Sequence, residues 1–386
     1  MNREQPPLVF VFSTAYLPLV GGAELAIDHI ARRIKNIRFL ILTARFSRKF
    51  PVHEVRDNIE IIRLGVGLPF DKWLLPFLGF WRGSQLIRKR RPNLLWGMMI
   101  SQGTLAGYFL KKKFPALPFI VTLQEGDSPR HLKHARAGLI HYFWRVVLRA
   151  ADDVTAISLY LKKLAGEAGY MQDVHIIPNG VEEKYFEEVG ERELKKNLGF
   201  SQNEKIILSV SRLEEKNGLA DLLRALAFLI PKYHPLKLLV VGEGSLREQL
   251  ENLALKLHLG NSAIFLGKIP HENLLDYYQA SDVFARPSLS EGLGTAFLEA
   301  MAAGVPVVAT PVGGIADFLK DGETGIMVEP GNPESIKRGI EKILTNRAFA
   351  DTIKVNARKL VRENFLWIDI AKKMADLFQR HIKPQS

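Results

Sequence analysis

The sequence contains no cysteine, which excludes a disulfide scaffold, a thiolate metal site and a thiol nucleophile. Long apolar runs are also missing, because long uncharged stretches such as residues 6–23 and 300–316 are interrupted by glycine and proline. A membrane-spanning helix needs about 20 predominantly apolar residues, so we expect none. Residues 1–13 form a poor secretory signal, and we expect a cytoplasmic chain.

Several catalytic motifs are absent too. No two aspartates stand two residues apart, so the Asp-x-Asp metal clamp of many nucleotide-sugar enzymes is missing. There is no Gly-x-Ser-x-Gly elbow, no Gly-x-x-x-x-Gly-Lys-Ser/Thr loop and no His-x-x-x-His pair. His131 and His134 stand three apart and are interpreted as surface residues. We therefore expect no metal site.

What the sequence does contain is an uneven charge. It has 386 residues, enough for two domains with separate cores, and 53 Lys+Arg against 41 Asp+Glu. Residues 1–186 carry 27 basic and 15 acidic side chains, whereas the remainder is balanced. This asymmetry indicates an anionic partner for the first half, a membrane surface or a nucleic acid; the alternative is a solvated basic surface with no partner.

Short β-branched runs alternate with helical patterns throughout. The predicted strands are Leu8–Phe12, Arg38–Thr43, Ile59–Leu64, Asn93–Trp96, Pro118–Leu123, Asp153–Ile157, Val174–Ile177, Ile206–Ser211, Leu236–Val241, Ala263–Leu266, Val283–Ala285 and Val307–Ala309. This alternation predicts two α/β domains, each a doubly wound parallel sheet of the Rossmann-like kind. We place them at residues 1–186 and 205–367, with a charged linker at 187–204 and a final helix at about 368–386 assigned to the first domain.

In open α/β sheets, ligands bind beyond the carboxyl ends of the strands, so the loops there are the candidate sites. The loop 287–294 contains Gly292 and Gly294, and a helix is predicted to begin near Thr295, a good N-cap residue. The first amides of a helix favour an anion or sugar hydroxyls. Glu291 and Glu299 flank this helix start and suit vicinal hydroxyls, although Glu299 alone also reads as an ordinary first-turn acid.

Three other strand-end loops carry candidate phosphate ligands. Arg212 and Lys216 follow the strand 206–211, where they would clamp a diphosphate or else pair with Glu214 and Glu215. Gly242, Glu243 and Gly244 follow the next strand, and Gly21 and Gly22 follow the first strand of the chain. Neither glycine pair has the spacing of a dinucleotide fingerprint.

Taken together, these loops resemble the retaining glycosyltransferases of the GT-B fold, family four (glycosyl transferases group 1). The resemblance covers almost the whole chain and is strongest over residues 206–334, where Glu291 and Glu299 match the Glu-x7-Glu signature. Further matching blocks, in chain order, are Ile177–Val181, Gly242–Gly244, Leu298–Val308, Gly313-Gly314 and Asp321–Gly325.

The resemblance implies a metal-independent transfer of a hexose, with retention, from a nucleotide-diphosphate sugar to a lipid-linked or glycan acceptor in cell-envelope glycan synthesis. It implies no cofactor besides this co-substrate. By resemblance, Arg212 and Lys216 hold the diphosphate, Glu299 binds the ribose, and Glu291 with the backbone of Gly292, Leu293, Gly294 and Thr295 holds the sugar. Gly242 and Glu243 lie at the nucleotide, and Gly22 approaches the phosphates from the first domain.

Two positions depart from the family pattern. The family places its lysine directly before the glycine, whereas Asn217 stands there and Lys216 is one residue earlier. A histidine often follows the strand that ends near Leu123, but this chain has Gln124. We therefore assign Gln124 and Asp127 to the acceptor and sugar side, with Asp127 the clear match in that loop.

An aromatic and basic segment lies in the first half. Trp73, Phe77, Phe80 and Trp81 stand beside Lys72 and Arg82, followed by four consecutive cations, Arg88–Arg91. This composition suits an anionic membrane surface, which predicts a peripheral protein on the inner face of the membrane. The alternative is that the rings face the core and the cations face water.

Two other functions stay open from the residues alone. A nucleotide-sugar epimerase also uses two facing α/β domains, but it needs acid–base groups in the first domain, and the Glu-x7-Glu block argues against it. A nucleic-acid-binding protein would rest on the net charge of +12 alone, and since no recognised binding motif accompanies it, we expect no nucleic-acid partner.

Overall fold

The computed structural model describes residues 6–126, 139–187 and 191–382. Contacts divide the chain into two units, residues 1–179 with 367–386, and residues 180–366. The first unit thus ends at residue 179 rather than 186, and the stretch expected to be a linker, 187–204, belongs to the second unit.

A buried lysine explains why the charged stretch belongs to the second unit. Helix α7 (Glu191–Asn197) lies in the charged stretch, and its Lys195 is almost fully buried. The Lys195 ammonium lies 3.2 Å from a carboxylate oxygen of Asp282 and donates to the backbone carbonyl of Glu204 at 3.1 Å. A high charge content therefore does not make this stretch a linker, because one of its charges is paired inside the second unit.

The first unit is built on an eight-stranded sheet in the order β3-β4-β2-β1-β5-β6-β7-β8. Its elements are β1 (Leu8–Phe12), α1 (Gly22–Arg33), β2 (Arg38–Ala44), β3 (His53–Arg56), β4 (Ile59–Leu64), α2 (Asp71–Arg90), β5 (Leu94–Met98), α3 (Gln102–Lys113), β6 (Phe119–Leu123), α5 (Leu139–Ala150), β7 (Asp153–Ala156), α6 (Leu159–Glu167), β8 (Val174–Ile176) and α14 (Trp367–His381). All neighbouring strands pair in parallel except β3 and β4. Strand β3 was not predicted, because its residues are polar and mostly exposed.

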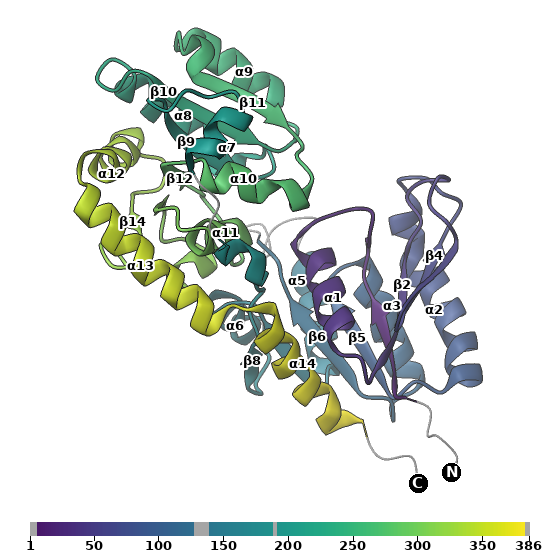
Figure 1. Ribbon diagram of the computed structural model, residues 1–386. Coiled ribbons are helices and arrows are strands. Elements are labelled where there is room, and N and C mark those ends of the chain that lie inside the picture. Colours follow the sequence, from purple (N-terminus) through teal and green to yellow (C-terminus); the bar gives the residue numbers. More distant parts are fainter. Residues whose placement is uncertain (1–5, 127–138, 188–190, 383–386) are drawn as a thin grey trace. The chain divides into compact units, whose positions relative to one another are not determined.

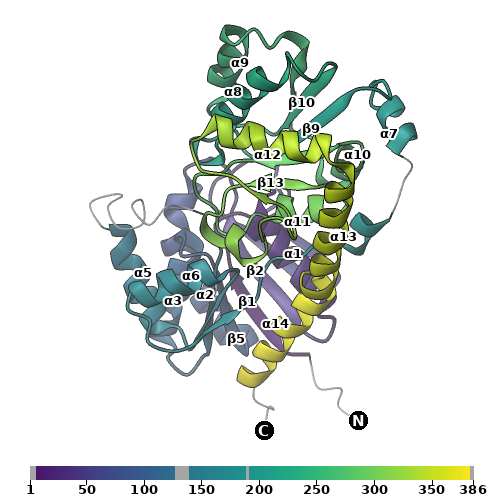
Figure 2. The ribbon, with the colours of Figure 1, turned by 90° about the vertical axis from the view of Figure 1, so that its left-hand side faces the viewer.

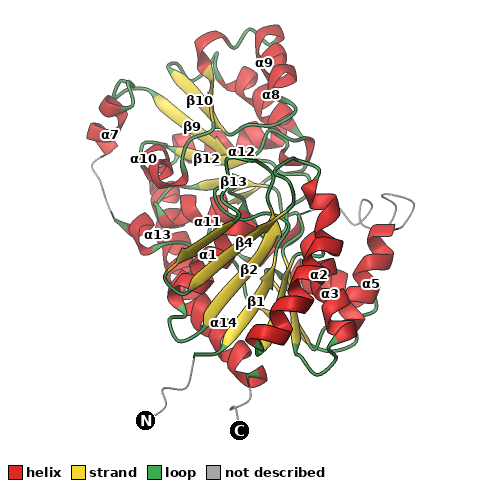
Figure 3. Cartoon of the chain, turned by 90° about the vertical axis from the view of Figure 1, so that its right-hand side faces the viewer, coloured by secondary structure: helices red, strands yellow, loops and turns green. Residues whose placement is uncertain are grey.

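Helices cover both faces of this sheet. Alternate residues of a strand point to opposite faces, so Val9 and Val11 of β1 join the core cluster under α1 and α14. On the other face, α2, α3 and α5 lie side by side (Figure 3). Helix α14 returns to the first unit (Figure 1). There Trp367 stacks on His29 with ring centroids 4.8 Å apart, and Phe378 packs on Trp96.

The second unit contains a six-stranded parallel sheet in the order β11-β10-β9-β12-β13-β14. Besides α7, its elements are η2 (Glu183–Phe186), β9 (Lys205–Val210), η3 (Glu215–Asn217), α8 (Leu219–Leu229), β10 (Leu236–Val241), α9 (Arg247–Lys256), η4 (Gly260–Ser262), β11 (Ala263–Gly267), η5 (His271–Asn273), α10 (Leu274–Gln279), β12 (Val283–Arg286), α11 (Thr295–Ala302), β13 (Val307–Ala309), η6 (Gly313–Asp317), β14 (Ile326–Met327), α12 (Pro333–Thr345) and α13 (Arg347–Asn364). The prediction of two doubly wound α/β domains is confirmed.

Helix α13 is the longest element of the second unit that the sequence patterns did not predict. Asn346 caps it, accepting a hydrogen bond from the backbone N–H of Phe349 at 3.1 Å, and its buried residues follow helical spacing. Helix α13 contacts α11 (Figure 2), while α8, α9 and α12 share a core cluster with strands β9, β10 and β12. In the described part of the chain, no helix combines the length and apolar character that crossing a bilayer requires.

Candidate active site

The candidate loops of the second unit follow three neighbouring strands. In the sheet, β9 lies between β10 and β12 and pairs in parallel with both. The carboxyl ends of parallel neighbours meet at one edge of a sheet, so the loops after these strands must pack against one another.

Two glycines allow this close packing. Gly218 has a φ of +67°, and a Cβ built on it would lie 1.9 Å from the backbone oxygen of Pro287. Gly242 has a φ of +133°, and its Cβ would lie 1.9 Å from the backbone oxygen of Ser211. Only glycine adopts these backbone angles freely and leaves room for the neighbouring chain. The three loops therefore form one layer of backbone over the strand ends.

The loop that carries Lys216 is joined directly to the loop that carries Glu291. The backbone N–H of Leu289 donates to the backbone oxygen of Lys216 at 2.7 Å. Asn217, which stands where the family has its lysine, is buried and donates its side-chain amide to the backbone oxygen of Arg212 at 2.6 Å. Asn217 thus stabilises the loop through this buried hydrogen bond. Lys216 is therefore the lysine of this loop that we assign to the position of the family lysine.

Arg212 lies at the surface of this layer. Its side chain is 69% exposed and pairs with Glu214 at 3.0 Å. Pairing with Glu214 is the alternative to a diphosphate clamp that the sequence left open for Arg212. An exposed ion pair contributes about 0–1 kcal/mol, so little free energy opposes exchange of Glu214 for a phosphate oxygen.

Glu291 is held by an arginine that the sequence analysis did not single out. Arg286, at the end of β12, is buried, and its Nη2 lies 2.5 Å from Glu291 Oε2. The same guanidinium donates to the backbone oxygen of Val210 at 3.1 Å and lies 4.2 Å from the ring centroid of Phe297. These contacts fix the position of the Glu291 carboxylate within the loop.

Helix α11 begins at Thr295, and Gly294 is its N-cap residue. The prediction of Thr295 as the N-cap is therefore wrong. The reason is conformational: Gly294 takes the left-handed angles φ 91° and ψ 66°, and a Cβ there would lie 2.5 Å from the Phe297 ring. The loop residues Gly292 and Leu293 are buried, so the backbone approaches the start of α11 closely.

Glu299 is buried one turn into α11 and has partners different from those of Glu291. One carboxylate oxygen lies 2.8 Å from His271 Nε2, and the other accepts a hydrogen bond from the Tyr278 hydroxyl at 2.9 Å. The two signature acids therefore belong to separate hydrogen-bond networks. Each carboxylate oxygen has a second lone pair, which is able to accept a hydrogen bond from a hydroxyl group.

The charge of Glu299 alters the titration of its neighbours. Burial alone would lower the pKa of His271, but the hydrogen bond and negative charge of Glu299 outweigh it and raise this pKa above its ordinary value of 6.5. Burial and then the same charge raise the pKa of Tyr185 and that of Tyr278 far above the ordinary value of 10. Both tyrosines therefore remain neutral hydrogen-bond donors.

The third loop positions Glu243 at the surface. The backbone N–H of Leu213 donates to the backbone oxygen of Glu243 at 3.0 Å, which ties this loop to the Arg212 loop. The exposed carboxylate of Glu243 pairs with Arg247 of α9 at 3.0 Å. Of the predicted residues, the structure thus joins the loops of Arg212, Lys216, Gly242, Glu243 and Glu291 through backbone contacts.

In the first unit, two predicted positions lie together. A Cβ on Gly22 would lie 3.7 Å from the side-chain nitrogen of Asn179. The amides of Asn179 and Gln124 form a reciprocal pair, with donor–acceptor distances of 3.0 and 3.1 Å. The start of α1 and the end of β6 are therefore linked through Asn179. Asp127 lies outside the described residues.

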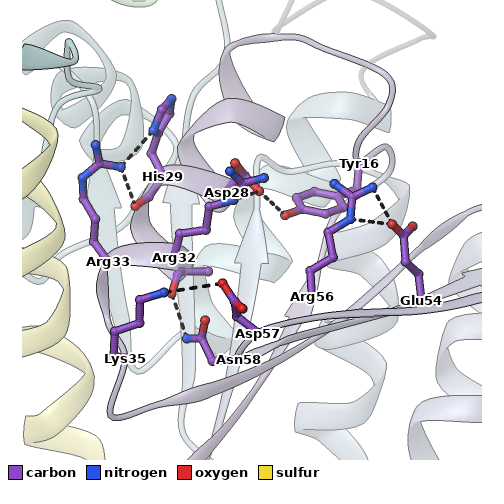
Figure 4. A network of polar contacts seen from close by, with 11 residues as sticks. Tyr16, Asp28, His29, Arg32, Arg33, Lys35, Glu54, Arg56, Asp57 and Asn58 are labelled. Carbon is purple, nitrogen blue, oxygen red and sulfur yellow. Dashed lines mark hydrogen bonds and ion pairs between the residues drawn. The ribbon is translucent and has the colours of Figure 1, made fainter. Parts of the chain in front are cut away.

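The loop that leads to Gly22 is anchored by a buried acid (Figure 4). The Tyr16 hydroxyl donates to Asp28 of α1 at 2.9 Å, and Arg32 pairs with the same carboxylate oxygen at 2.9 Å. Burial and the charge of Asp28 raise the pKa of Tyr16 well above its ordinary value. Since Tyr16 and Asp28 are both buried, they hold the loop to the helix and so position its first turn.

Several residues that contact the candidate site residues of the two units were not predicted as site residues, among them Arg286, His271, Tyr278, Asn179 and Glu125. Buried Glu125 accepts from its neighbour's backbone N–H at 2.9 Å. Arg286 has a visible signal, because it is the one charged residue of the otherwise apolar strand β12. Asn179 stands in a block that the sequence analysis matched, whereas His271 and Tyr278 show no local pattern. Among the described residues, no group of three or more histidines and carboxylates is placed to hold a metal ion.

Comparisons with known proteins identify the family. Residues 190–360 match the family described as Glycosyl transferases group 1, and residues 20–185 match Glycosyltransferase Family 4. Over 353 residues the chain is 30% identical to N-acetyl-alpha-D-glucosaminyl L-malate synthase of Bacillus anthracis, covering 90% of this chain and 89% of the relative. It is also 30% identical to the GDP-mannose-dependent alpha-(1-6)-phosphatidylinositol monomannoside mannosyltransferase of Mycolicibacterium smegmatis, over 59% of this chain and 62% of that relative.

The fold has a close counterpart among solved structures. Sucrose-phosphate synthase from Thermosynechococcus elongatus superposes with a TM-score of 0.88 at 24% identity, covering 97% of this chain and 98% of that one. The fold and the matched signature define a glycosyltransferase of the GT-B fold. The chain belongs to the group 1 glycosyltransferases, which confirms the expected family and enzyme class.

Proposed function

We propose that this glycosyltransferase moves a hexose from a nucleotide-diphosphate sugar to a lipid-linked or glycan acceptor, with retention of the anomeric configuration and without a metal ion. The observation that carries the proposal is the single layer formed by three strand-end loops, in which the Lys216 loop is hydrogen-bonded to the Glu291 loop. Cations, acids and the start of α11 are thereby concentrated at one edge of one sheet.

Each chemical part of the donor has a matching group at this edge. Lys216 and Arg212 would neutralise the diphosphate, Arg212 by leaving its exposed pair with Glu214. The backbone from Gly292 to Thr295, at the positive end of α11, and the fixed carboxylate of Glu291 would receive the sugar. Glu299 would accept hydrogen bonds from the ribose hydroxyls, with Gly242 and Glu243 beside the nucleotide.

The reaction replaces one bond to the anomeric carbon with another and transfers one proton. The acceptor hydroxyl oxygen bonds to the anomeric carbon, the bond from that carbon to the diphosphate oxygen breaks with its electron pair, and the hydroxyl proton passes to the departing diphosphate. Negative charge grows on the diphosphate as the bond breaks, so cations aimed there stabilise the transition state more than the bound donor. Arg212 and Lys216 would supply this stabilisation, and the sequence has no Asp-x-Asp clamp for a metal.

The acceptor class is supported by relatives. The printed name of the mannosyltransferase from M. smegmatis gives a GDP-sugar donor and a phosphatidylinositol-based acceptor. The basic first half of this chain is also compatible with an acceptor at an anionic lipid surface. Gln124 would lie on the acceptor side, to which Asp127 is also assigned, whereas Gly22, linked to Gln124 through Asn179, keeps its assignment to the donor phosphates.

The experiment begins with donor binding. Thermal stability is measured with UDP, GDP and ADP and with their sugars, because a ligand that binds the folded state raises the apparent melting temperature. We expect one nucleotide to give a shift that Lys216→Ala and Glu299→Gln reduce. The matched control is Lys320→Ala, an exposed lysine paired with Glu323. Equal shifts in all four proteins would refute the assigned site.

Turnover is then followed by NMR with the bound donor, a lipid-linked or glycan acceptor, and excess EDTA. We expect a product with the anomeric configuration of the donor, formed at the same rate with the chelator. An inverted product would refute retention, and loss of turnover restored by a divalent cation would refute metal independence. A second sugar epimer formed from the donor alone would refute transfer in favour of an epimerase.

A further inference from the structure

Helix α2 exposes a row of large apolar side chains. Trp73, Phe77 and Trp81 are 46%, 70% and 62% exposed, and Phe70 and Leu74 at its beginning are exposed as well. Because an α-helix turns about 100° per residue, these five positions fall within an arc of roughly 100° on one side of α2. We call this row the α2 aromatic face. Contiguous exposed apolar residues of this size mark an interaction surface, whereas scattered ones do not.

The packing of α2 determines that this row faces solvent. A Cβ on Gly79 would lie 2.7 Å from Cβ of Ala106, and one on Gly83 would lie 2.6 Å from Cδ1 of Leu110. The two glycines therefore let α2 approach α3 closely, and they fix its rotation about its own axis (Figure 3). The alternative, that all the aromatic residues of the segment face the core, is wrong.

The segment that forms α2 and α3 carries charge of one sign, although Glu60 pairs with Arg90 and Asp152 pairs with Lys111. Residues 72–124 contain nine lysines and arginines and no aspartate or glutamate. The preceding acid, Asp71, is buried, and its carboxylate accepts the backbone N–H of Gly67 at 2.7 Å. Arg88 continues the line of the α2 aromatic face and is exposed, and within the described residues it forms no ion pair.

We propose that the α2 aromatic face, with the cations that surround it, binds an anionic lipid bilayer. Tryptophan and phenylalanine enter the boundary between headgroups and acyl chains, while lysine and arginine contact lipid phosphates. Each cation near such a surface contributes roughly 1 kcal/mol. The row extends from Phe70 to Trp81, about 16 Å at 1.5 Å per residue, which suits a helix lying in the plane of the interface.

Charge distinguishes a bilayer from a second copy of the chain. In a symmetric dimer through the α2 aromatic face, the basic stretch 72–124 of one copy would oppose the same stretch of the other, and like charges brought together are unfavourable. An anionic bilayer supplies the opposite charge. Binding to it requires no donor or acceptor, so this proposal does not depend on the proposed function.

The location of α2 gives such binding a consequence for the acceptor side. Helix α2 follows β4, so its beginning lies at the carboxyl edge of the first sheet. The same edge carries the loop before Gly22 and the end of β6 with Gln124. A bilayer in contact with Phe70 and Trp73 would therefore lie on the side of the unit to which we assign the acceptor.

Tryptophan fluorescence tests the proposal directly, because only Trp73 and Trp81 are exposed. The other three tryptophans are buried: Trp96, Trp144 and Trp367. Vesicles of phosphatidylcholine with phosphatidylglycerol should co-sediment with the protein and shift its emission to shorter wavelength. Phosphatidylcholine vesicles alone should bind less, and about 0.5 M salt should weaken binding by shortening the screening length to about 4 Å.

Variants distinguish loss of the fluorescence signal from loss of binding through the α2 aromatic face. Trp73→Phe with Trp81→Phe should remove the emission shift but keep co-sedimentation, whereas Phe77→Ser with Trp81→Ser should reduce partitioning at least about tenfold, a loss of about 1.4 kcal/mol. The control Leu255→Ser changes a side chain of the second unit that is 71% exposed, and it should bind like the wild type.

Three outcomes overturn the proposal. One is unchanged sedimentation of Phe77→Ser/Trp81→Ser, and another is sedimentation that salt and lipid charge do not affect. The third is a dimer in light scattering that this variant abolishes, with no vesicle binding by either protein, which would assign the surface to a second copy. Donor-induced thermal shifts should be the same in the variant and the wild type, so failure here is distinguishable from failure of the proposed function.

Discussion

Arg286 Nη2 lies 2.5 Å from Glu291 Oε2, and the arginine is buried while the carboxylate is only partly so. The first acid of the Glu-x7-Glu signature is therefore held in place by the last residue of strand β12. Because Arg286 already fixes Glu291, the proposed binding of a sugar hydroxyl to this carboxylate would cost little side-chain entropy.

Replacing Arg286 with Met should destabilise the protein and impair donor binding together. Removing one partner of a buried ion pair leaves the other uncompensated, which costs about 3–5 kcal/mol. Urea unfolding and donor-induced thermal shifts measure the two effects. Arg224→Met is the matched control, since Arg224 is half-exposed and paired with Asp221 at the surface; its change should stay below about 0.5 kcal/mol. Equal effects of the two substitutions would contradict the assignment.

Gly218→Ala should be much more destabilising than Gly331→Ala. The two glycines have nearly the same φ, +67° and +69°, so the backbone strain of an alanine is matched at about 1–2 kcal/mol. Only the Gly218 Cβ meets another atom, the Pro287 oxygen at 1.9 Å, whereas nothing lies within 4 Å at Gly331. Overpacking adds about 1–3 kcal/mol. Denaturant unfolding of both variants gives the difference directly, and a difference near zero would mean that the loops do not pack as described.

The pair His271–Glu299 should make stability depend on pH in a defined direction. The folded-state pKa of His271 is raised, so its contribution is fully present below the unfolded value of about 6.5 and is lost as the pH rises through the folded value. The unfolding free energy of the wild type minus that of His271→Gln should therefore be largest near pH 5.5 and shrink towards pH 9, by on the order of 1 kcal/mol.

The Glu299→Gln variant provides the check on this pH dependence. Without the carboxylate, the charge that raises the pKa of His271 is gone. The difference between Glu299→Gln and the double variant His271→Gln/Glu299→Gln should consequently vary less with pH. A difference between the wild type and His271→Gln that stays constant from pH 5.5 to 9 would contradict the prediction.

Tyr16→Phe should destabilise the first unit by about 1–2 kcal/mol, because it removes a buried hydrogen bond to the charged Asp28. The loss of stability should be smaller than that caused by an unpaired buried charge, since Arg32 still pairs with Asp28. Tyr142→Phe, at a residue that is mostly exposed, is the control and should be neutral. Hydrogen exchange localises the effect: amides of the first turn of α1 should exchange faster in Tyr16→Phe, and unchanged exchange there would refute the anchoring role.

The elements that the sequence predicted correctly share a local origin. Buried strands such as β1 and β10 have the predicted bounds because a short apolar run between turn residues is sufficient to define them. Strand β3 escaped prediction because its residues are polar and mostly exposed, whereas helix α13 was missed although its buried residues follow helical spacing. Likewise, the assignment of the charged stretch 187–204 to the second unit depends on Lys195 and Asp282, which are far apart in the sequence.

The sequence by itself determined the family, the α/β architecture and the order of the loops that carry the candidate residues, because these depend on local patterns and on blocks of fixed spacing. Only the tertiary structure decided which partner each side chain meets. Glu291 pairs with Arg286, while Glu299 binds His271 and Tyr278. It also decided that α2 turns its aromatic row outward, since that rotation depends on how closely two of its glycines approach α3. Such contacts join residues distant in sequence, and no local spacing encodes them.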